Sequence, residues 1–168
     1  RAAAEGLLAG GVLPVIKHMP GHGRAGVDSH HALPVVDASR ELLEATDFAP
    51  FAAASEMPLA MTAHVVYTAL DPDRPATLSP IMIEAVIRGR LRFAGCLMTD
   101  DLSMKALGGS TEEKTRRALD AGVDLVLHCS GEMADMRRVA AACRPLDGVA
   151  AARAARALDF RRPPEAFD

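Results

Sequence analysis

The sequence predicts an α/β fold, specifically a (β/α)8 barrel of the TIM type, to which this chain contributes about four β/α units. Three observations support this prediction. Short apolar runs rich in β-branched residues alternate with segments of helical periodicity, which is typical of a parallel sheet. Polar residues capable of chemistry follow the predicted strands, where barrel enzymes place their active sites. A full barrel needs about 250 residues, so the 168 residues here provide only part of one.

Each predicted strand is a short apolar run. The run at residues 12–16 follows Gly10 and Gly11 and is rich in valine and isoleucine, so we expect a fully buried strand of a parallel sheet. The other three strands are expected at residues 61–66, 95–99 and 123–127.

Capping residues mark the predicted helices. Ser110 and Glu113 form a capping box, which predicts a helix over residues 111–121 with Gly122 as its C-terminal cap. The serine-proline pair at residues 79–80 predicts a helix that runs to residue 89. Further helices are expected at residues 38–44, 50–55, 132–143 and 148–158, and the first ten residues are expected to be the last turns of a helix in a fold that the chain enters partway.

Composition narrows the classes of function. The chain is 49% hydrophobic and 4% aromatic with a formal net charge of −3, so nothing points to nucleic acid or an anionic membrane as a partner. No apolar run approaches the length of a membrane span, and no signal-peptide pattern opens the chain, which favours a cytoplasmic location. Cys96, Cys129 and Cys143 are widely spaced and are expected to be reduced core thiols.

The segment richest in side chains that could take part in catalysis or binding is residues 17–34, KHMPGHGRAGVDSHHALP. It holds four of the chain's six histidines, namely His18, His22, His30 and His31. Its glycines and prolines predict a long loop, and long loops inside compact domains are usually functional or disordered. We therefore expect a site here, on a loop that can move relative to the strand before it.

Within this loop, Asp28 lies two residues before His30. A carboxylate at that spacing can accept a hydrogen bond from one ring nitrogen and fix the tautomer of the imidazole. His30 is therefore a candidate general acid or base.

Three segments, in order along the chain, resemble one known family. They are KHMPGHG with DSH at residues 17–30, MTAHVVY at 61–67 and TDDLSM at 99–104. These segments are similar to the signature of family 3 glycoside hydrolases, specifically the bacterial β-N-acetylglucosaminidases (β-N-acetylhexosaminidases) of cell-wall recycling. The resemblance implies that residues 1–168 are the C-terminal half of a single catalytic barrel, strands five to eight, and that an N-terminal half absent from this sequence is required.

The resemblance also implies a reaction. It predicts a retaining exo-β-N-acetylglucosaminidase that releases terminal N-acetylglucosamine from muropeptide-type glycosides through a covalent intermediate, with no cofactor and no metal. Asp100 matches the family's nucleophile, and His30 assisted by Asp28 matches its acid/base pair. Retaining hydrolysis needs both roles, because one group attacks the anomeric carbon while another protonates the leaving oxygen and then activates water.

Three further residues are expected to bind substrate. Lys17 and His18 would donate hydrogen bonds to sugar hydroxyls. His64 is also expected near the sugar, although a core histidine bonded to a backbone carbonyl explains its position equally well. Asp101, beside Asp100, is expected to point elsewhere and to act as a turn former or as the cap of a short helix over residues 102–107.

The residues alone leave three alternatives open. An aldolase-type barrel would form a Schiff base at Lys17, but it leaves Asp28, His30 and Asp100 less well explained. A metal-dependent barrel hydrolase would gather the loop histidines around zinc, but a loop rich in glycine and proline does not preset that geometry. A non-catalytic half-barrel is the third alternative, because four β/α units expose two sheet edges.

Overall fold

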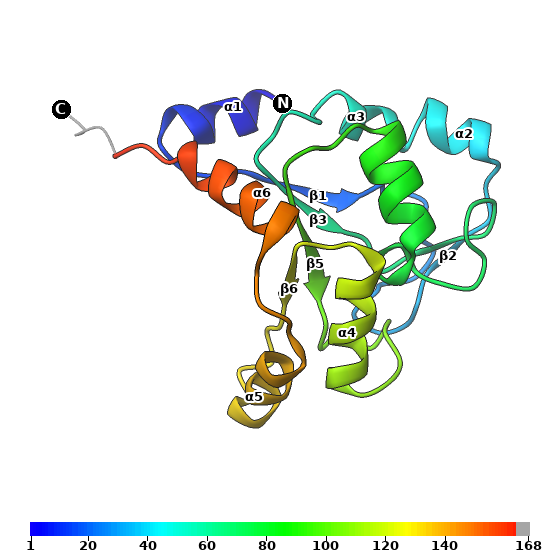
Figure 1. The fold of residues 1–168 in the computed structure, drawn as a ribbon. Helices are drawn as coiled ribbons and strands as arrows, with labels where there is room; N and C mark the ends of the chain where they lie inside the picture. The colour runs from blue at the N-terminus through cyan, green and yellow to red at the C-terminus, as the bar shows by residue number, and fades with distance from the viewer. Residues whose placement is uncertain (164–168) are drawn as a thin grey trace.

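The computed structural model describes residues 1–163 and contains a four-stranded parallel sheet (Figure 1). Its strands are β1 (Val15–Met19), β3 (Leu59–Thr62), β5 (Cys96–Asp101) and β6 (Leu125–Leu127), which lie in this order across the sheet. Each strand pairs in parallel with the next strand of the sheet along the chain. The predicted α/β fold with a parallel sheet is therefore confirmed.

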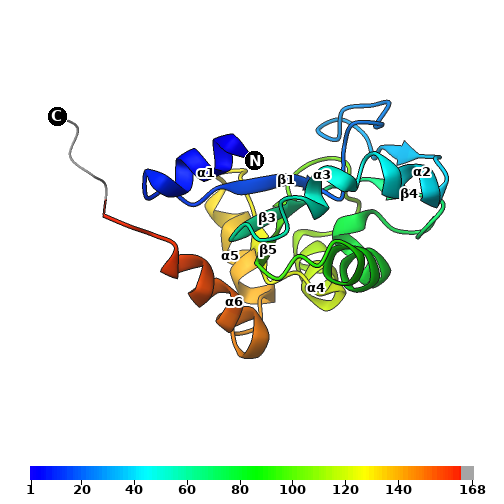
Figure 2. The ribbon, with the colours of Figure 1, turned by 90° about the horizontal axis from the view of Figure 1, so that it is seen from above.

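Helices connect these strands. They are α1 (Ala2–Ala9) before β1, α2 (Arg40–Ala45) and α3 (Ala49–Ala52) before β3, η1 (Ala76–Leu78) and η2 (Ile81–Arg90) before β5, α4 (Thr111–Ala121) before β6, and α5 (Met133–Ala142) and α6 (Gly148–Asp159) after it. Figures 1 and 2 show η2, in green, and α4 side by side against the sheet. Parallel strands joined in this way all have their carboxyl ends on the same side of the molecule, and residues from different strands can meet there.

The main core lies between the sheet and these two helices. Leu97 of β5 packs with Ile83 and Ile87 of η2 and with Leu119 of α4 in one cluster of buried side chains. A second cluster contains Tyr67, which is fully buried. Burying one aliphatic side chain of this size contributes about 1.5–3 kcal/mol, so these contacts hold the sheet and the helices together.

The capping residues act as predicted. In α4 the Ser110 hydroxyl accepts a hydrogen bond from the Glu113 backbone N–H at 3.2 Å, and Gly122 ends the helix with a φ of 110°. In η2 the Ser79 hydroxyl accepts from the Met82 N–H at 3.1 Å. This helix has π-type i→i+5 hydrogen bonding rather than the α-helical geometry that the sequence pattern predicted.

Strand β1 lies three residues later than predicted. Val12 is exposed, and its N–H donates to the Leu7 carbonyl at 2.8 Å, so the chain is still completing the end of α1 at this point. Pairing with β3 begins only at Val15. Lys17 and His18 consequently lie within the strand rather than after it. Val15 is itself exposed, because β1 is an edge strand of this sheet and is not fully buried as expected.

The other strand boundaries also differ from the predicted ones. β3 ends at residue 62 rather than residue 66, because its register is set by parallel pairing with β1 and β5. The next apolar residues instead form β4 (Val66–Tyr67), which pairs with β2 (Val35–Val36) in a separate two-stranded sheet that the sequence did not predict. β5 extends to residue 101, and β6 begins at residue 125.

Only one of the three cysteines is a core residue. Cys96 is buried within β5, and burial raises the pKa of its thiol to about 11. Cys129 and Cys143 are exposed, because the first follows β6 and the second ends α5. All three are free thiols, as expected, but the prediction of a core position is wrong for two of them.

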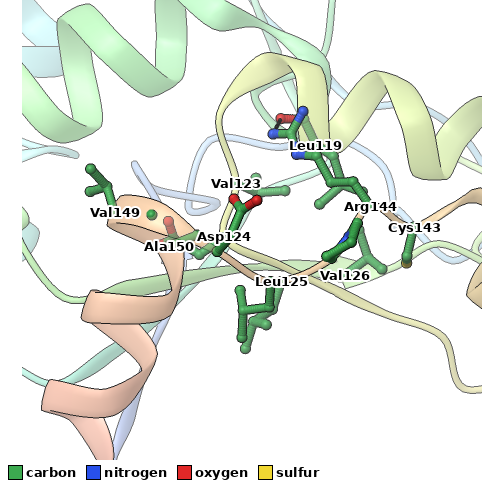
Figure 3. Close-up of a pocket in the computed structure, with 13 residues that line it drawn as sticks. Leu119, Val123, Asp124, Leu125, Val126, Cys143, Arg144, Val149 and Ala150 are labelled. Atoms are coloured by element: carbon green, nitrogen blue, oxygen red, sulfur yellow. Dashed lines mark hydrogen bonds between the residues drawn. The ribbon is translucent and has the colours of Figure 1, made fainter.

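A pocket of about 460 Å³ lies between α4, β6 and the connection from α5 to α6 (Figure 3). Apolar side chains such as Leu119 and Val126 line it together with Arg144. The Arg144 guanidinium donates to the Leu119 carbonyl at 2.7 Å and pairs with Asp120 at 3.3 Å. None of the residues expected to be functional lines this pocket. In the part of the chain that the structure describes, no helix is long and apolar enough to cross a membrane.

Candidate active site

A different pocket, of about 320 Å³, lies at the carboxyl ends of β1 and β5. Five of the six residues that the sequence analysis expected at the site line it, namely Lys17, His18, Asp28, His30 and Asp100. His22 and Ser29 complete the lining, and His64 does not reach it. The fold therefore brings together residues that are up to 83 positions apart in the sequence, from 17 to 100.

Asp100 lies near the end of β5 with its side chain 15% exposed. Its Oδ1 accepts a hydrogen bond from the backbone N–H of Asp101 at 2.8 Å. Its Oδ2 lies 3.4 Å from Nε2 of His18 on β1. One carboxylate oxygen is thus held by the backbone, while the other lies beside a pocket-lining imidazole.

His18 behaves as a neutral hydrogen-bonding group. Burial lowers the pKa of its imidazole, and this effect outweighs the opposing attraction of the Asp100 carboxylate. The positive charge of Lys17 lowers the pKa of His18 further. Near neutral pH the contact with Asp100 is therefore not a full ion pair.

The Asp101 side chain is fully engaged by the chain itself. Its Oδ1 accepts from the N–H groups of Ser103 and Cys129, both at 2.9 Å, and its Oδ2 accepts from the Ser103 hydroxyl. Burial alone would raise the pKa of Asp101, but these hydrogen bonds lower it below its ordinary value. Asp101 is thus a turn former, one of its two predicted roles. Residues 102–107 form turns rather than the short helix expected there, because the carboxylate folds back onto Ser103.

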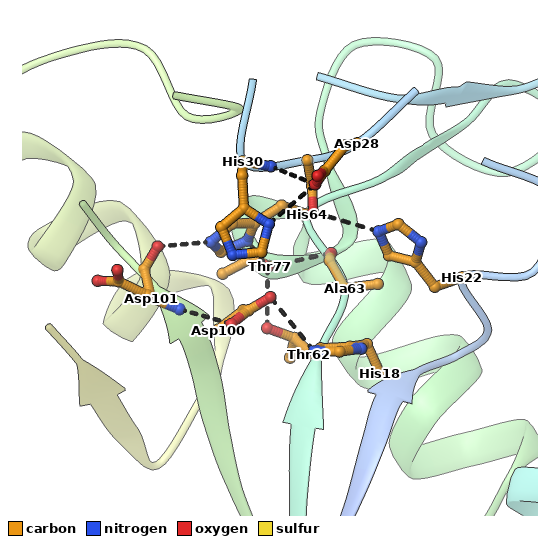
Figure 4. A network of polar contacts seen from close by, with 11 residues as sticks. His18, His22, Asp28, His30, Thr62, Ala63, His64, Thr77, Asp100 and Asp101 are labelled. Carbon is orange, nitrogen blue, oxygen red and sulfur yellow. Dashed lines mark hydrogen bonds and ion pairs between the residues drawn. The ribbon is translucent and has the colours of Figure 1, made fainter. Parts of the chain in front are cut away.

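Asp28 and His30 form a bonded pair on the loop after β1 (Figure 4). Asp28 Oδ1 accepts from Nδ1 of His30 at 2.8 Å and from its backbone N–H at 2.9 Å. The backbone hydrogen bond, followed by the one from the ring, lowers the pKa of Asp28. An ionised carboxylate can only accept, so the Nδ1 of His30 carries the proton and its Nε2 is left to react. Both side chains are largely exposed.

The loop that carries this pair is held at several points. The buried Tyr67 hydroxyl donates to the Gly21 carbonyl. Arg24 pairs with Asp47 at 2.6 Å, so its guanidinium is already engaged within the protein. His22 Nε2 lies 3.3 Å from the Ser29 hydroxyl, a contact within the loop itself. The exposed Asp28 and His30 therefore lie on a loop whose base is fixed.

His64 lies just beyond β3 and is completely buried. Its Nδ1 is 2.7 Å from the Thr77 hydroxyl, and its Nε2 is 3.1 Å from the Asp101 carbonyl oxygen (Figure 4). Both ring nitrogens are thus occupied by protein groups. The structure does not support the expected sugar contact and agrees with the alternative of a core histidine bonded to a backbone carbonyl.

Three hydroxyl-bearing residues at or near the site were not predicted from the sequence, namely Ser29, Thr62 and Thr77. Threonine and serine are common in loops and caps, so their types carried no signal. Thr77 becomes recognisable only in the fold, where it is fully buried and contacts both Thr62 and His64. Among residues 1–163, no group of three or more His, Cys, Asp or Glu side chains is arranged to hold a metal ion.

A parallel α/β sheet with carboxylates and histidines gathered at the carboxyl ends of its strands has the organisation of a barrel enzyme. Residues 1–158 match the family described as the glycosyl hydrolase family 3 N terminal domain. The chain therefore belongs to this family, whose fold is a TIM-type (β/α)8 barrel. The predicted barrel class and the family resemblance are both confirmed.

Individual relatives agree with this assignment. A β-hexosaminidase from Alkalilimnicola ehrlichii is 42% identical over 134 residues, which cover 77% of this chain and 38% of that protein. A glycoside hydrolase family 3 β-N-acetylglucosaminidase from Paenibacillus sp. str. FPU-7 is similar in structure with a TM-score of 0.79 and 36% identity, over 94% of this chain and 31% of that one. NagZ from Neisseria gonorrhoeae, solved in complex with N-trifluoroacetyl-D-glucosamine, is also similar in structure, with a TM-score of 0.80 and 34% sequence identity. The match covers 94% of this chain and 45% of that one.

This chain therefore spans less than half the length of each of these three relatives. The family assignment does not favour the three alternatives that the residues alone left open, namely the Schiff-base aldolase, the metal-dependent hydrolase and the non-catalytic half-barrel.

Proposed function

We propose that the protein carrying this chain is a retaining exo-β-N-acetylglucosaminidase. The observation that carries the proposal is that Asp100 and the bonded pair of Asp28 and His30 line one pocket from separate elements, β5 and the loop after β1. This arrangement supplies a carboxylate and an independent proton donor, the two groups that retaining hydrolysis requires.

In the first step, Asp100 attacks the anomeric carbon through Oδ2, while the Asp101 N–H holds Oδ1. The protonated imidazole of His30 donates its Nε2 proton to the glycosidic oxygen as the carbon–oxygen bond breaks. The aglycone leaves as an alcohol, and the sugar is joined to Asp100 as an ester. Asp28 stabilises the imidazolium before transfer and keeps the proton on Nδ1 throughout.

In the second step, Nε2 of neutral His30 accepts a proton from a water molecule. The resulting hydroxide equivalent attacks the anomeric carbon from the face that the aglycone left, and the bond to Asp100 breaks. The products are the free sugar with retained β configuration, the Asp100 carboxylate and protonated His30. Both groups have then returned to their starting states.

Lys17 and His18 are proposed to bind sugar hydroxyls. Lys17 is exposed on β1 and lines the pocket, so its ammonium group offers three donors there. His18 lines the same pocket, and because burial lowers its pKa it can present one nitrogen as donor and the other as acceptor. A polar, hydroxyl-rich ligand needs such fixed partners.

The N-acetyl preference is proposed from the relatives, which are named β-hexosaminidase and β-N-acetylglucosaminidase. The solved NagZ structure contains N-trifluoroacetyl-D-glucosamine, an amide of glucosamine. We extend the proposal to muropeptide-derived glycosides in peptidoglycan recycling, which the resemblance of the sequence motifs implies, and to the cytoplasmic location expected from the sequence.

We further propose that the pocket is completed by an N-terminal half-barrel in the same chain or complex. Strands β1 and β6 are the two edges of the four-stranded sheet, and neither has a second partner strand within residues 1–163. A closed barrel pairs both edges, and the relatives are more than twice as long as the segment they share with this chain.

The proposal is tested by assaying the full-length protein on 4-nitrophenyl β-glycosides that differ only at C2. We expect hydrolysis of the β-N-acetylglucosaminide and at least about tenfold lower kcat/KM on the β-glucoside, because an unfilled acetamido site loses at least about 1.4 kcal/mol of transition-state binding. Equal or faster hydrolysis of the glucoside would overturn the N-acetyl assignment. Hydrolysis of neither substrate would overturn the proposed activity.

A further inference from the structure

A buried polar network contacts the backbone of Asp101, the residue that follows Asp100. The fully buried His64 contacts the Thr77 hydroxyl at 2.7 Å and the Asp101 carbonyl at 3.1 Å. The Thr77 hydroxyl lies 2.8 Å from the hydroxyl of Thr62, the last residue of β3. These four groups link β3, η1 and β5, and Figure 4 shows them together with Asp100 and the loop residues Asp28 and His30.

The donor and acceptor of each hydrogen bond in this network follow from the protons that its groups carry. A carbonyl oxygen can only accept, so the contact with Asp101 requires a proton on Nε2 of His64. Burial lowers the pKa of His64 despite the nearby carboxylates, so the ring is neutral and its Nδ1 carries a lone pair. The Thr77 hydroxyl has one proton and two acceptors within reach, Nδ1 of His64 at 2.7 Å and the Ala63 carbonyl oxygen at 3.1 Å. Because Nδ1 carries no proton, Thr77 is the donor in the shorter contact with His64, and Thr62 then donates to Thr77. The network has one direction, from the Thr62 hydroxyl to the Asp101 carbonyl.

The end of this network is joined to the proposed nucleophile. Besides His64, the Asp101 carbonyl accepts from the Met104 N–H at 3.2 Å. The Asp101 side chain is held by Ser103 and Cys129, and its N–H donates to Asp100 Oδ1. Every polar group of Asp101 is therefore occupied, and one of these bonds sets the orientation of the Asp100 carboxylate.

We infer that His64 and Thr77 are positioning residues for Asp100. Thr77, supported by Thr62, holds His64 in the Nε2–H tautomer, His64 holds the Asp101 carbonyl, and the Asp101 N–H then aligns the Asp100 carboxylate for attack. This inference rests on the proposed function, because it assigns the network to the nucleophile of that reaction. It gives His64 a role in the reaction that needs no contact with the sugar.

Misalignment of the nucleophile should lower kcat rather than weaken substrate binding, since a displacement of about 1 Å in a reacting group can lower the rate by about 10²-fold. Thr77→Val removes only the hydroxyl at nearly constant volume and leaves Nδ1 of His64 without a donor. We therefore expect kcat to fall by about 10- to 10²-fold with KM within about twofold of the wild-type value. Thr77→Ser restores the hydroxyl and should return kcat to within about threefold of wild type.

The structure offers a matched control. Thr115 is also fully buried, and its hydroxyl donates to the Thr111 carbonyl at 2.8 Å within α4. Thr115→Val makes the same chemical change away from Asp100 and should leave kcat unchanged. Thr62→Val is a second test variant, which removes the donor to Thr77 and should lower kcat in the same direction as Thr77→Val, by a smaller factor.

Nuclear magnetic resonance provides a readout that does not depend on activity. In the full-length protein, ¹⁵N-labelled histidine should show His64 protonated on Nε2, and Thr77→Val should shift its ring nitrogens toward a mixture of tautomers. ¹³C-labelled aspartate should show the Asp100 carboxyl resonance move in Thr77→Val but not in Thr115→Val. Two results would overturn the inference. The first is a wild-type His64 that is protonated on Nδ1. The second is a Thr77→Val variant in which the Asp100 resonance and kcat are as unchanged as they are in Thr115→Val. A wild-type protein without glycosidase activity would instead overturn the proposed function, and the resonances would still decide the positioning.

Discussion

Nε2 of His18 lies 3.4 Å from Oδ2 of Asp100 although these residues come from β1 and β5, two strands separated in the sheet by β3. Parallel strands end at a common edge, so residues distant in sequence meet there. The contact places the proposed nucleophile beside a histidine that lines the same pocket. The adjacent Asp101 has different partners, because its carboxylate accepts hydrogen bonds from the N–H groups of Ser103 and Cys129.

Replacing each of these adjacent aspartates should give opposite results. Asp100→Asn keeps the shape of the side chain but removes the nucleophile, so kcat/KM should fall by about 10⁴-fold or more, with little change in unfolding free energy. Asp101→Asn weakens the turn and should lower the unfolding free energy by about 1–3 kcal/mol. Steady-state kinetics and urea unfolding measure both effects. Near-normal activity in Asp100→Asn, with activity abolished in Asp101→Asn, would reverse the assignment.

His30 should matter most when the leaving group is poor. An aryl aglycone of low pKa leaves without protonation, whereas an alkyl or sugar aglycone needs a proton from the general acid. His30→Ala should therefore lose about 10²–10⁴-fold in kcat on poor leaving groups and much less on 2,4-dinitrophenol. A series of aryl β-N-acetylglucosaminides provides the measurement. Equal losses across the series would mean that His30 does not protonate the leaving oxygen.

The pair of Asp28 and His30 predicts an acid-side titration. Hydrogen bonds from His30 lower the pKa of Asp28, so the pair is fully present above the ordinary aspartate pKa of about 3.9 and is lost as the pH falls through the lower folded value. A ¹³C titration of the Asp28 carboxyl should therefore show a midpoint below about 3.9.

The matched variants for this titration are His30→Ala and His31→Ala. His30→Ala removes the ring hydrogen bond and should raise the Asp28 midpoint clearly. The side chain of His31 affects the Asp28 carboxyl through its charge alone, and this is the smallest of the effects on its pKa, so His31→Ala should move the midpoint much less. An Asp28 midpoint that is the same in the wild type and in both variants would show that the pair does not form in solution.

A buried ion pair between Arg88 of η2 and Asp124, the residue before β6, should contribute strongly to stability. Arg88 pairs with Asp124 at 2.7 Å, their side chains are 8% and 2% exposed, and Asp124 also accepts from Arg153 and from the Leu97 N–H. Asp124→Ala leaves these donors buried without a partner and should lower the unfolding free energy by about 3–5 kcal/mol.

The control for this prediction is an exposed pair. Asp120 pairs with Arg144 at 3.3 Å, but their side chains are 74% and 57% exposed. Asp120→Ala should therefore cost less than about 1 kcal/mol. Urea unfolding of the two variants compares them directly, and similar losses in both would show that the buried pair is not a special source of stability.

Much of this organisation was predictable because it depends on local patterns. Ser110 and Glu113 correctly predicted the start of α4. The spacing of Asp28 and His30 predicted the hydrogen-bonded pair that the structure contains. The exact register of the strands was not predictable, because pairing with neighbouring strands decides where β1 and β3 begin and end.

The buried network was not predictable from sequence for a related reason. His64 belongs to a motif that pointed to the site, but nothing in the motif showed which groups its ring nitrogens would meet. Its partners are Thr77, on η1, and the carbonyl of Asp101, at the end of β5. Such a contact arises only when three segments pack together, so it had to come from the structure.

The most direct test of the account is to follow the anomer that the full-length protein releases first. Hydrolysis of 4-nitrophenyl β-N-acetylglucosaminide in EDTA, monitored by ¹H nuclear magnetic resonance before the sugar equilibrates, reports stereochemistry and metal dependence together. We expect the β anomer of N-acetylglucosamine to appear first and EDTA to have no effect on the rate, since Asp100 and His30 are proposed to supply both catalytic roles. Initial release of the α anomer, or loss of activity in EDTA, would contradict it.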